Sequence, residues 1–514
     1  MKVLKKKVRV TEILILTYPS LLFSLLLYLL FRTSLVADEG THLLLSAFYR
    51  DLFFYMIKTR HFSFSSAYSF GIDYLVTYPK LQVAYPPVYH LTTGLVFFSI
   101  IGKSYLAGRI CNFTYFILTS LLLYKLIRKF FNRSVAILSL ILWIGTPFSF
   151  LHAFKAMKDF TVFFWLFLSI YIYIRNLKRG SNKLWFLLGF ILSLTLLSER
   201  LAVFSLLFFL SHYFFILKRG KLKPVLITLL GFSILTIPYS LLILKLNLLR
   251  INYLVGFWYG EQQGEPTSYL DPYFWLWYLF KSTLQYPLLP ALFLSFVYYV
   301  YKKEKYWKEL LLWFLIFYFG LSTIPNKEPR FSLFFLLPTI VTTSFLVSKN
   351  RRLILLLLVY LFVSIPFMLE CGYLSYPSKK IATAVYDYAK EKNGNVAMFS
   401  EGDPLFSSVL MWHLAEIDKE RKIRVLRACA FENKTTDKIM LTLRENNVRI
   451  IVNNKATEII NPMKLPNVTL LQSIQGTEIF EIKGKSVGDK RCCLLYTSDA
   501  ADEGLGVDLG GRRI

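Results

Sequence analysis

Side chains that could transfer a proton stand at the edges of long apolar runs in this sequence. Asp38 and Glu39 follow the first such run, and Asp159 stands at the edge of a later one. Two adjacent carboxylates at a hydrocarbon boundary are costly unless they are solvated, paired or used. A carboxylate placed there could deprotonate a hydroxyl group, so all three are candidate catalytic residues. A solvated helix start capped by Asp38 explains the same pattern without chemistry.

Basic side chains mark two further edges. Lys327 and Arg330 belong to the charged turn Pro325–Arg330, and Arg200 follows Glu199. Arginine can hold phosphate oxygens through a bidentate fork, which suits a phosphate at a membrane surface. A tight charged turn and a local ion pair are the alternative interpretations. A lipid phosphate that carries a sugar would need both sets of groups, because cations stabilise the departing phosphate and a carboxylate activates the acceptor.

The elements that must position these residues are membrane helices. The chain has 514 residues, of which 55% are hydrophobic, and its mean hydropathy is +0.48. Such a composition is too apolar for a soluble protein, and about 20 apolar residues form a helix that crosses roughly 30 Å of hydrocarbon. About eleven runs qualify and predict an all-α polytopic bundle over residues 1–372. They are 12–31, 105–124, 134–154, 160–174, 184–198, 201–217, 224–245, 282–301, 309–324, 331–348 and 353–371.

The basic residues indicate how the chain threads through the membrane. The net charge is +28, and its clusters fall in short loops between apolar runs, all on the side of the basic N-terminus. This pattern follows the positive-inside rule and argues against nucleic-acid binding. It predicts a multi-pass protein of the plasma membrane with a cytoplasmic N-terminus, and it places the candidate site outside. The outer loop 32–104 would carry juxtamembrane helices, and Pro86–Ile101 would dip into the outer face without crossing.

The chain changes character after the last apolar run. Helical and β-rich patterns alternate over residues 373–490, which predicts a small α/β extracytoplasmic domain. It has no glycine-rich phosphate loop, so no nucleotide site is expected. Residues 493–514 match, when back-translated, the constant parts of a sequencing adapter. We therefore interpret this segment as adapter read-through and not as native sequence.

An ordered set of motifs resembles the GT-C glycosyltransferases, specifically the dolichyl-phosphate-mannose protein mannosyltransferase and aminoarabinose transferase group. The resemblance covers about Leu14–Val347. The acidic pair at Asp38 matches the family's first outer loop, and Asp159 falls where a second outer acid is expected. The remaining pieces, in family order, are Tyr85–Tyr89, Gly102–Ser104 with Arg109, Phe130–Arg133 and Glu328–Phe331.

This resemblance implies a GT-C type fold and an inverting transfer of sugar from a polyprenyl-phosphate donor outside the cytoplasm. It makes Asp38 the general base and Arg330 a donor-phosphate contact, with Glu39 and Asp159 in positioning roles. The chain departs from the family at Glu199, where relatives often carry a lysine, which puts one phosphate contact in doubt.

Several points stay open at the level of sequence. Relatives include metal-dependent and metal-independent enzymes, so a divalent metal is not decided. The sugar is undetermined, and the acceptor could be protein, lipid or glycan. A polyprenyl-linked sugar flippase or transporter is the main alternative to the enzyme, and a non-catalytic subunit of a glycan assembly pathway is the third reading. A transporter would place charges near the midplane, whereas the informative charges here lie at the outer edges.

Overall fold

A computed structural model gives the architecture of the chain. It describes residues 2–483, except for a set of short gaps and one longer gap. The gaps are 82–84, 246–269, 287, 325–326, 351–352, 355–356, 358–360, 367–375, 401, 403–404, 432–433, 456–457 and 459. The interpreted adapter segment 493–514, the predicted outer segment 247–273 for the most part and much of the predicted span 353–371 lie outside the described residues.

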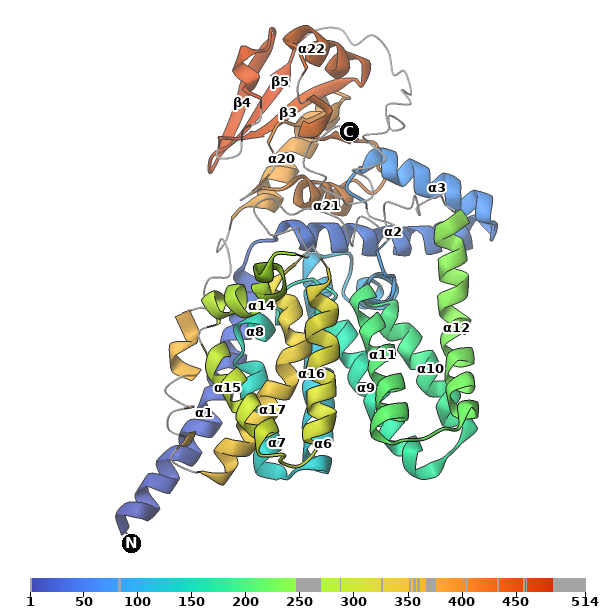
Figure 1. Cartoon of the computed structure of the whole chain (residues 1–514). Helices are drawn as coiled ribbons and strands as arrows, with labels where there is room; N and C mark the ends of the chain where they lie inside the picture. The colour runs from blue at the N-terminus through green and yellow to red at the C-terminus, as the bar shows by residue number, and fades with distance from the viewer. Residues whose placement is uncertain are drawn as a thin grey trace.

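Helices that stand side by side form the lower body of the molecule (Figure 1). Aromatic side chains fill much of its core, as where Trp143 packs edge-on against Phe163 with ring centres 5.5 Å apart. The helices are α1 (Lys2–Arg32), α6 (Tyr105–Phe130), α7 (Arg133–Ile144), α8 (Pro147–Ala153), α9 (Asp159–Arg179), α10 (Asn182–Leu196), α11 (Val203–Ser211), α12 (Leu222–Lys245), α15 (Leu289–Tyr301), α16 (Trp307–Ser322) and α17 (Leu333–Lys349).

The predicted helical membrane bundle is confirmed at this coarse level. Within the described ranges, four helices are long and apolar enough to cross a membrane, or five if a bent pair is one span. That pair, α7 and α8, turns by 65°, so the predicted span Ser134–Phe154 is not one straight helix. Gly145 ends α7, and Pro147 begins α8, as its missing N–H allows. The number of eleven spans stays a prediction.

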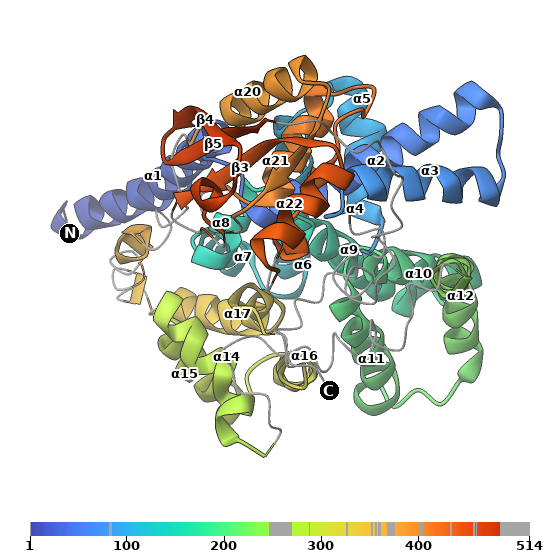
Figure 2. The same cartoon turned by 90° about the horizontal axis from the view of Figure 1, so that it is seen from above.

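A second layer of helices lies across one end of the bundle. It consists of α2 (Ala37–Thr59) and α3 (Phe64–Thr77), joined at a turn in which Arg60 is left-handed (Figures 1 and 2). The segment predicted to dip into the outer face is helical, with a π-helical turn at Thr92–Phe97 between α4 (Val88–Leu91) and α5 (Phe98–Ile100).

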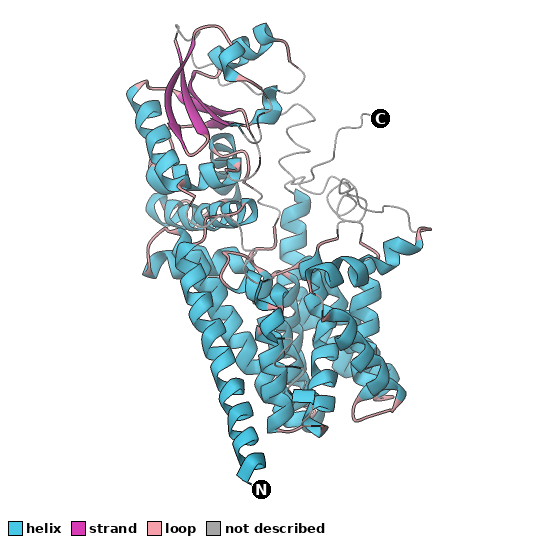
Figure 3. Ribbon diagram, turned by 90° about the vertical axis from the view of Figure 1, so that its left-hand side faces the viewer, coloured by secondary structure: helices cyan, strands magenta, loops and turns pink. Residues whose placement is uncertain are grey.

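The C-terminal part is an α/β unit above this layer (Figure 3). Its five-stranded sheet has the order β2-β1-β3-β5-β4, parallel on the β1 side and antiparallel at β3, β5 and β4. Gln475 and Gly476, both at positive φ, close the β4–β5 hairpin. The elements are α20 (Ser378–Glu391), β1 (Asn395–Met398), α21 (Ser407–Ile417), β2 (Val425–Leu426), α22 (Thr436–Glu445), β3 (Val448–Asn454), β4 (Val468–Ile474) and β5 (Thr477–Ile482).

Helix α21 packs directly on α2. The Ser408 hydroxyl donates a hydrogen bond to the Ala37 carbonyl oxygen (2.8 Å). A Cβ atom added at Gly40 would lie 2.7 Å from the Ser408 carbonyl carbon, so this close approach requires glycine. The α/β unit therefore rests on the same helical turn that carries Asp38.

The basic loops gather at the opposite end of the bundle (Figure 1). There Lys305 donates to the Phe130 carbonyl oxygen (2.6 Å), and Lys349 pairs with Glu304 (2.6 Å). The loops that follow α6 and α15 and the end of α17 thus lie together, and the predicted threading of the chain through the membrane stays a prediction.

Candidate active site

Arg330 joins three carboxylates at the end of the bundle nearest the α/β unit. Its Nη1 lies 3.3 Å from Asp38 Oδ2, and its Nε lies 2.6 Å from Glu328 Oε2 and 3.8 Å from Asp159 Oδ1. The structure therefore brings three of the sequence-predicted site residues into one cluster, although Asp38 and Arg330 are 292 positions apart.

Helix ends hold all of these groups. Asp38 lies in the first turn of α2, and Asp159 is the first residue of α9. Acidic side chains are stabilised there by the positive end of the helix dipole. Arg330 belongs to the 3₁₀ turn η4 (Pro329–Ser332), which leads into α17. Each of these groups thus projects from the end of a helix or from a 3₁₀ turn.

Asp38 is the accessible member of the cluster. About half of its side-chain surface (52%) is exposed, against 12% for Arg330 and 13% for Asp159. Burial raises the pKa of Glu328, while the charge of Arg330 opposes this shift. A hydroxyl-bearing molecule that approaches the cluster would meet the Asp38 carboxylate first.

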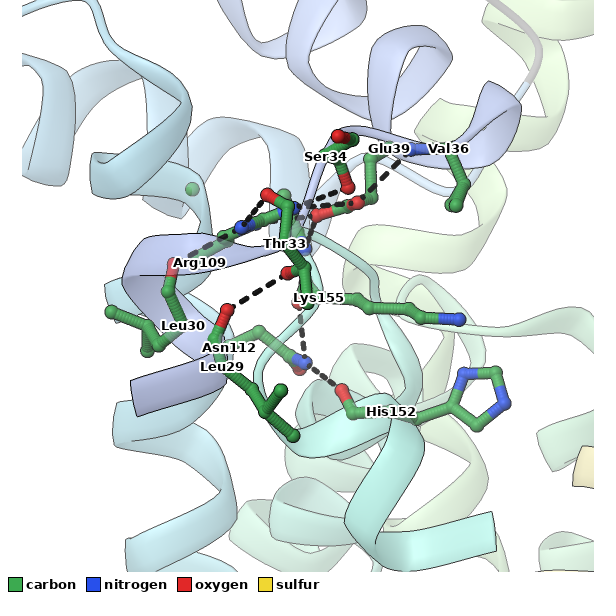
Figure 4. A network of polar contacts seen from close by, with 12 residues as sticks. Leu29, Leu30, Thr33, Ser34, Val36, Glu39, Arg109, Asn112, His152 and Lys155 are labelled. Atoms are coloured by element: carbon green, nitrogen blue, oxygen red, sulfur yellow. Dashed lines mark hydrogen bonds and ion pairs between the residues drawn. The ribbon is translucent and has the colours of Figure 1, made fainter. Parts of the chain in front are cut away.

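Glu39, the next residue of α2, lies in a buried bidentate pair with Arg109 (Figure 4). Its Oε1 accepts from Arg109 Nε (2.8 Å) and its Oε2 from Arg109 Nη2 (3.0 Å), and both side chains have no exposed surface. The Ala156 N–H also donates to Glu39 (2.8 Å). Successive helical residues project about 100° apart, which explains how one carboxylate faces solvent and its neighbour the core.

The Glu39–Arg109 pair fastens four segments together. Arg109 comes from α6 and also donates to the carbonyl oxygens of Leu30, Thr33 and Ser34 at the end of α1 (2.9–3.0 Å). Asn112, one turn later, donates to the carbonyls of His152 and Lys155. These contacts favour a positioning role for Glu39, and its predicted part in catalysis is not tested by them. In the sequence, Arg109 is recognisable only as part of a motif, and no local pattern indicates Glu39 as its partner.

Lys158 and Lys155 add positive charge that sequence analysis did not assign to the site. Lys158 Nζ lies 2.7 Å from Glu199 Oε2 and 4.8 Å from the centre of the Tyr85 ring. Burial lowers the pKa of Lys155, and the charge of Arg330 lowers it further, while the charges of Glu39, Asp38 and Asp159 raise it. Two lysines from the loop before α9 therefore lie close to the cluster. The family that the sequence resembles often has a lysine at position 199, where this chain has a glutamate.

The two remaining predicted phosphate contacts have other neighbours. Lys327 is buried, donates to the Ser322 carbonyl oxygen (2.6 Å) and lies 3.7 Å from the Phe274 ring centre. Arg200 begins the 3₁₀ turn η2 (Arg200–Ala202) and interacts electrostatically with Tyr239, Glu199 and Tyr85. Their predicted roles stay predictions.

A histidine pair lies one turn further along α2. His90 Nδ1 lies 2.9 Å from the Pro86 carbonyl oxygen, an acceptor only, so this nitrogen carries a proton. His90 Nε2 then accepts from His42 Nδ1 (2.9 Å) when both rings are neutral. Burial lowers the pKa of His42, and His90, Lys158 and Arg330 lower it further. Within the described residues, no group of three or more His, Cys, Asp or Glu side chains is placed to hold a metal ion.

Comparison with known proteins agrees with this architecture. Residues 84–243 match the model of the family described as dolichyl-phosphate-mannose-protein mannosyltransferase. The structure is similar to ArnT from Cupriavidus metallidurans in its apo state (TM-score 0.58, 12% identity, covering 91% of this chain and 98% of that one). It is also similar to the same protein bound to undecaprenyl phosphate (TM-score 0.56, 11% identity, covering 92% and 99%). A search of curated sequences found no match.

Fold and site together define a polytopic helical membrane protein with a charged cluster at one end of its bundle and an α/β unit above it. The resemblance to the GT-C superfamily of glycosyltransferases is confirmed, and the chain has the fold of that superfamily.

Proposed function

We propose that this protein transfers a sugar from a polyprenyl-phosphate donor to an acceptor hydroxyl on the extracytoplasmic side of the membrane, with inversion at the anomeric carbon. The observation that carries the proposal is the half-exposed Asp38 carboxylate 3.3 Å from the Arg330 guanidinium. A base and a phosphate-binding cation side by side are what such a transfer requires.

The chemistry divides between these two residues. Asp38 takes the proton of the acceptor hydroxyl as its oxygen attacks the anomeric carbon. The bond from that carbon to the phosphate oxygen breaks, and polyprenyl phosphate leaves with the bonding electrons. Arg330 balances the negative charge that develops on the phosphate. Because Arg330 is paired with carboxylates in the structure, a donor phosphate would replace one of them, and the exposed Asp38 is the one free to turn toward the acceptor.

Lys155 is the proposed second phosphate contact. It interacts electrostatically with Arg330 and lies in the loop that Asn112 and Glu39 hold in place. Glu199 stands where relatives often carry a lysine, and it is paired with Lys158. In this proposal, lysines of the loop before α9 provide the positive charge that the relatives' lysine would provide. A divalent metal is the alternative source of this charge, and a chelator titration of purified enzyme with added Mg²⁺, Mn²⁺ or Zn²⁺ distinguishes the two.

The test is sugar transfer by purified protein in detergent, with radiolabelled polyprenyl-phosphate sugars and a panel of lipid, peptide and glycan acceptors. Labelled product that forms with time and enzyme concentration would establish the transferase, and its acceptor would be read from the panel. If no donor turns over, while the same protein in liposomes moves labelled donor between leaflets, the proposal is wrong and the transporter alternative is right.

A further inference from the structure

A polar cavity lies away from the proposed active site. Its volume is about 700 Å³, and it opens between the second half of α2, the loop before α6 and the end of α21. Asp51 in its wall is thirteen residues after Asp38 on the same helix, or roughly 20 Å at about 1.5 Å per residue. The cavity is therefore separate from the Asp38–Arg330 cluster, and an inference about it does not depend on the transferase chemistry.

Basic side chains dominate the wall of this cavity. Five line it: Arg50, Lys58, Lys103, Lys419 and Arg421. The two acidic lining residues are already engaged. Asp51 accepts from Lys103 Nζ (3.1 Å), Tyr74 OH (3.3 Å) and, at 3.5 Å, Arg50 Nη1, and Glu416 pairs with Lys379 (2.7 Å). An excess of positive charge is thus left to face the cavity.

Two guanidinium groups in the wall have hydrogen-bond donors without partners. Among the described residues, no acceptor reaches the buried Nε of Arg50 or the buried Nη1 of Arg421. The Arg421 guanidinium lies over the rings of Phe70 (4.5 Å) and Tyr74 (5.0 Å), and Arg50 lies over Phe54 (5.2 Å). A buried donor left unpaired is costly, so these stacked groups are oriented for an acceptor that the protein itself does not supply.

The surroundings of the cavity favour a ligand with phosphate oxygens. Arginine forks bind phosphate bidentately, and lysines add point charges around it. Burial lowers the pKa of Lys103, and the charges of Arg50 and Arg421 act in the same direction, as expected where cations crowd together. Beside the cavity, α2 exposes Phe53, Phe54 and Ile57. A phosphate head group on an apolar anchor would match both features.

We infer that this cavity is a phosphate-binding site for a phospholipid head group or a soluble phosphorylated ligand. Both sources share the chemistry of phosphate oxygens against two arginines and three lysines. The cavity joins α2 to the α/β unit, so an occupant would contact both parts of the molecule.

The experiment measures binding of two probes to full-length protein. Inorganic pyrophosphate represents the soluble source, and nanodiscs with phosphatidylglycerol, compared with phosphatidylcholine alone, represent the lipid source. The variants are Arg50→Gln with Arg421→Gln, and the milder Lys419→Gln at an exposed position. The control is Lys438→Gln, an exposed lysine of α22 outside the cavity.

We expect the double variant to lose about tenfold or more in affinity for at least one probe, which corresponds to about 1.4 kcal/mol or more. Lys419→Gln, which leaves the packed guanidiniums in place, should lose about threefold, and Lys438→Gln should match wild type. Loss with pyrophosphate alone identifies a soluble ligand, and loss with phosphatidylglycerol alone identifies a lipid. If wild type and Lys419→Gln bind both probes equally, the inference is overturned, even where the double variant does not fold.

Discussion

Two adjacent acids have different surroundings in this protein. Asp38 is half exposed beside Arg330, whereas Glu39 is buried against Arg109. The sequence suggested both as candidates because both stand at the same hydrocarbon edge. It could not separate them, because Glu39 and its partner are 70 positions apart and only the packing of α2 on α6 shows which acid faces inward.

Glu39→Gln should destabilise the protein without removing a group from the reacting centre. Loss of one partner leaves a buried charge uncompensated, which typically costs about 3–5 kcal/mol. Thermal unfolding in detergent should show a clear fall in midpoint for Glu39→Gln. Asp73→Asn, an exposed acid of α3, is the matched control and should melt as wild type does. Equal midpoints for the two variants would show that the pair does not hold the site.

Arg330→Gln should lower transfer more than it lowers stability. Removing a donor that stabilises developing charge costs about 10²–10³ in rate. Arg330→Lys keeps the charge but not the fork and should recover part of the rate. Steady-state kinetics with varied polyprenyl-phosphate sugar measures this, and full activity in Arg330→Gln would remove Arg330 from the mechanism.

The His42 side chain should make the protein acid-sensitive. Burial holds its pKa below 6.5 in the folded state, so the unfolded chain binds a proton there that the folded chain does not. The free energy of unfolding does not depend on this group well above pH 6.5. Below pH 6.5 it falls by up to about 1.4 kcal/mol for each pH unit. His42→Gln should therefore lose less stability than wild type between pH 7 and 5.5. Thermal melts of both proteins at each pH measure this, and an equal loss of stability in wild type and His42→Gln would contradict the prediction.

Among the elements, the crossing of α2 and α21 links the α/β unit to the site. Gly40→Ala would place a Cβ atom 2.7 Å from the Ser408 backbone, so the helices must separate. We expect a loss of about 1–3 kcal/mol in stability, typical of overpacking, and reduced transfer.

Gly71→Ala in α3 is the control for that crossing. Its nearest contact would be 3.8 Å, to the Phe48 ring, and alanine should stabilise the helix by up to about 1 kcal/mol. If Gly40→Ala were as stable as Gly71→Ala, the crossing would not be the close contact that positions Asp38.

Local patterns predicted some elements well and missed others. The alternation of helical and β-rich runs after residue 373 predicted the α/β unit, because turn residues such as Gln475 and Gly476 delimit its short runs. The bend between α7 and α8 was missed because the length of the run Ser134–Phe154 predicts one span, although Gly145 and Pro147 within it mark the end of one helix and the start of the next. Apolar composition signals burial in lipid or protein and does not report a change of helix direction.

At the scale of the whole molecule, the positions of the charges define two ends. Basic loops gather at one end, and the Asp38–Arg330 cluster and the α/β unit lie at the other (Figure 1). The positive-inside rule then predicts that the cluster faces away from the cytoplasm.

Cysteine labelling of intact cells tests this orientation. In a chain without its native cysteines, Lys438→Cys in α22 should react with a membrane-impermeant maleimide. Lys223→Cys, in α12 near the basic loops, should react only after permeabilisation. Both positions are exposed, so access to solvent does not distinguish them. The reverse pattern would place the candidate site inside and contradict the proposed direction of transfer.

The central claim is that the Asp38 carboxylate accepts the proton of the attacking hydroxyl. Single-turnover transfer by Asp38→Asn, with donor binding measured on the same sample, tests it most directly. We predict donor affinity within a few-fold of wild type and a transfer rate lower by about 10²–10⁴, the usual contribution of a general base. Asp73→Asn should transfer at the wild-type rate. An Asp38→Asn enzyme that transfers sugar as fast as this control would contradict the account.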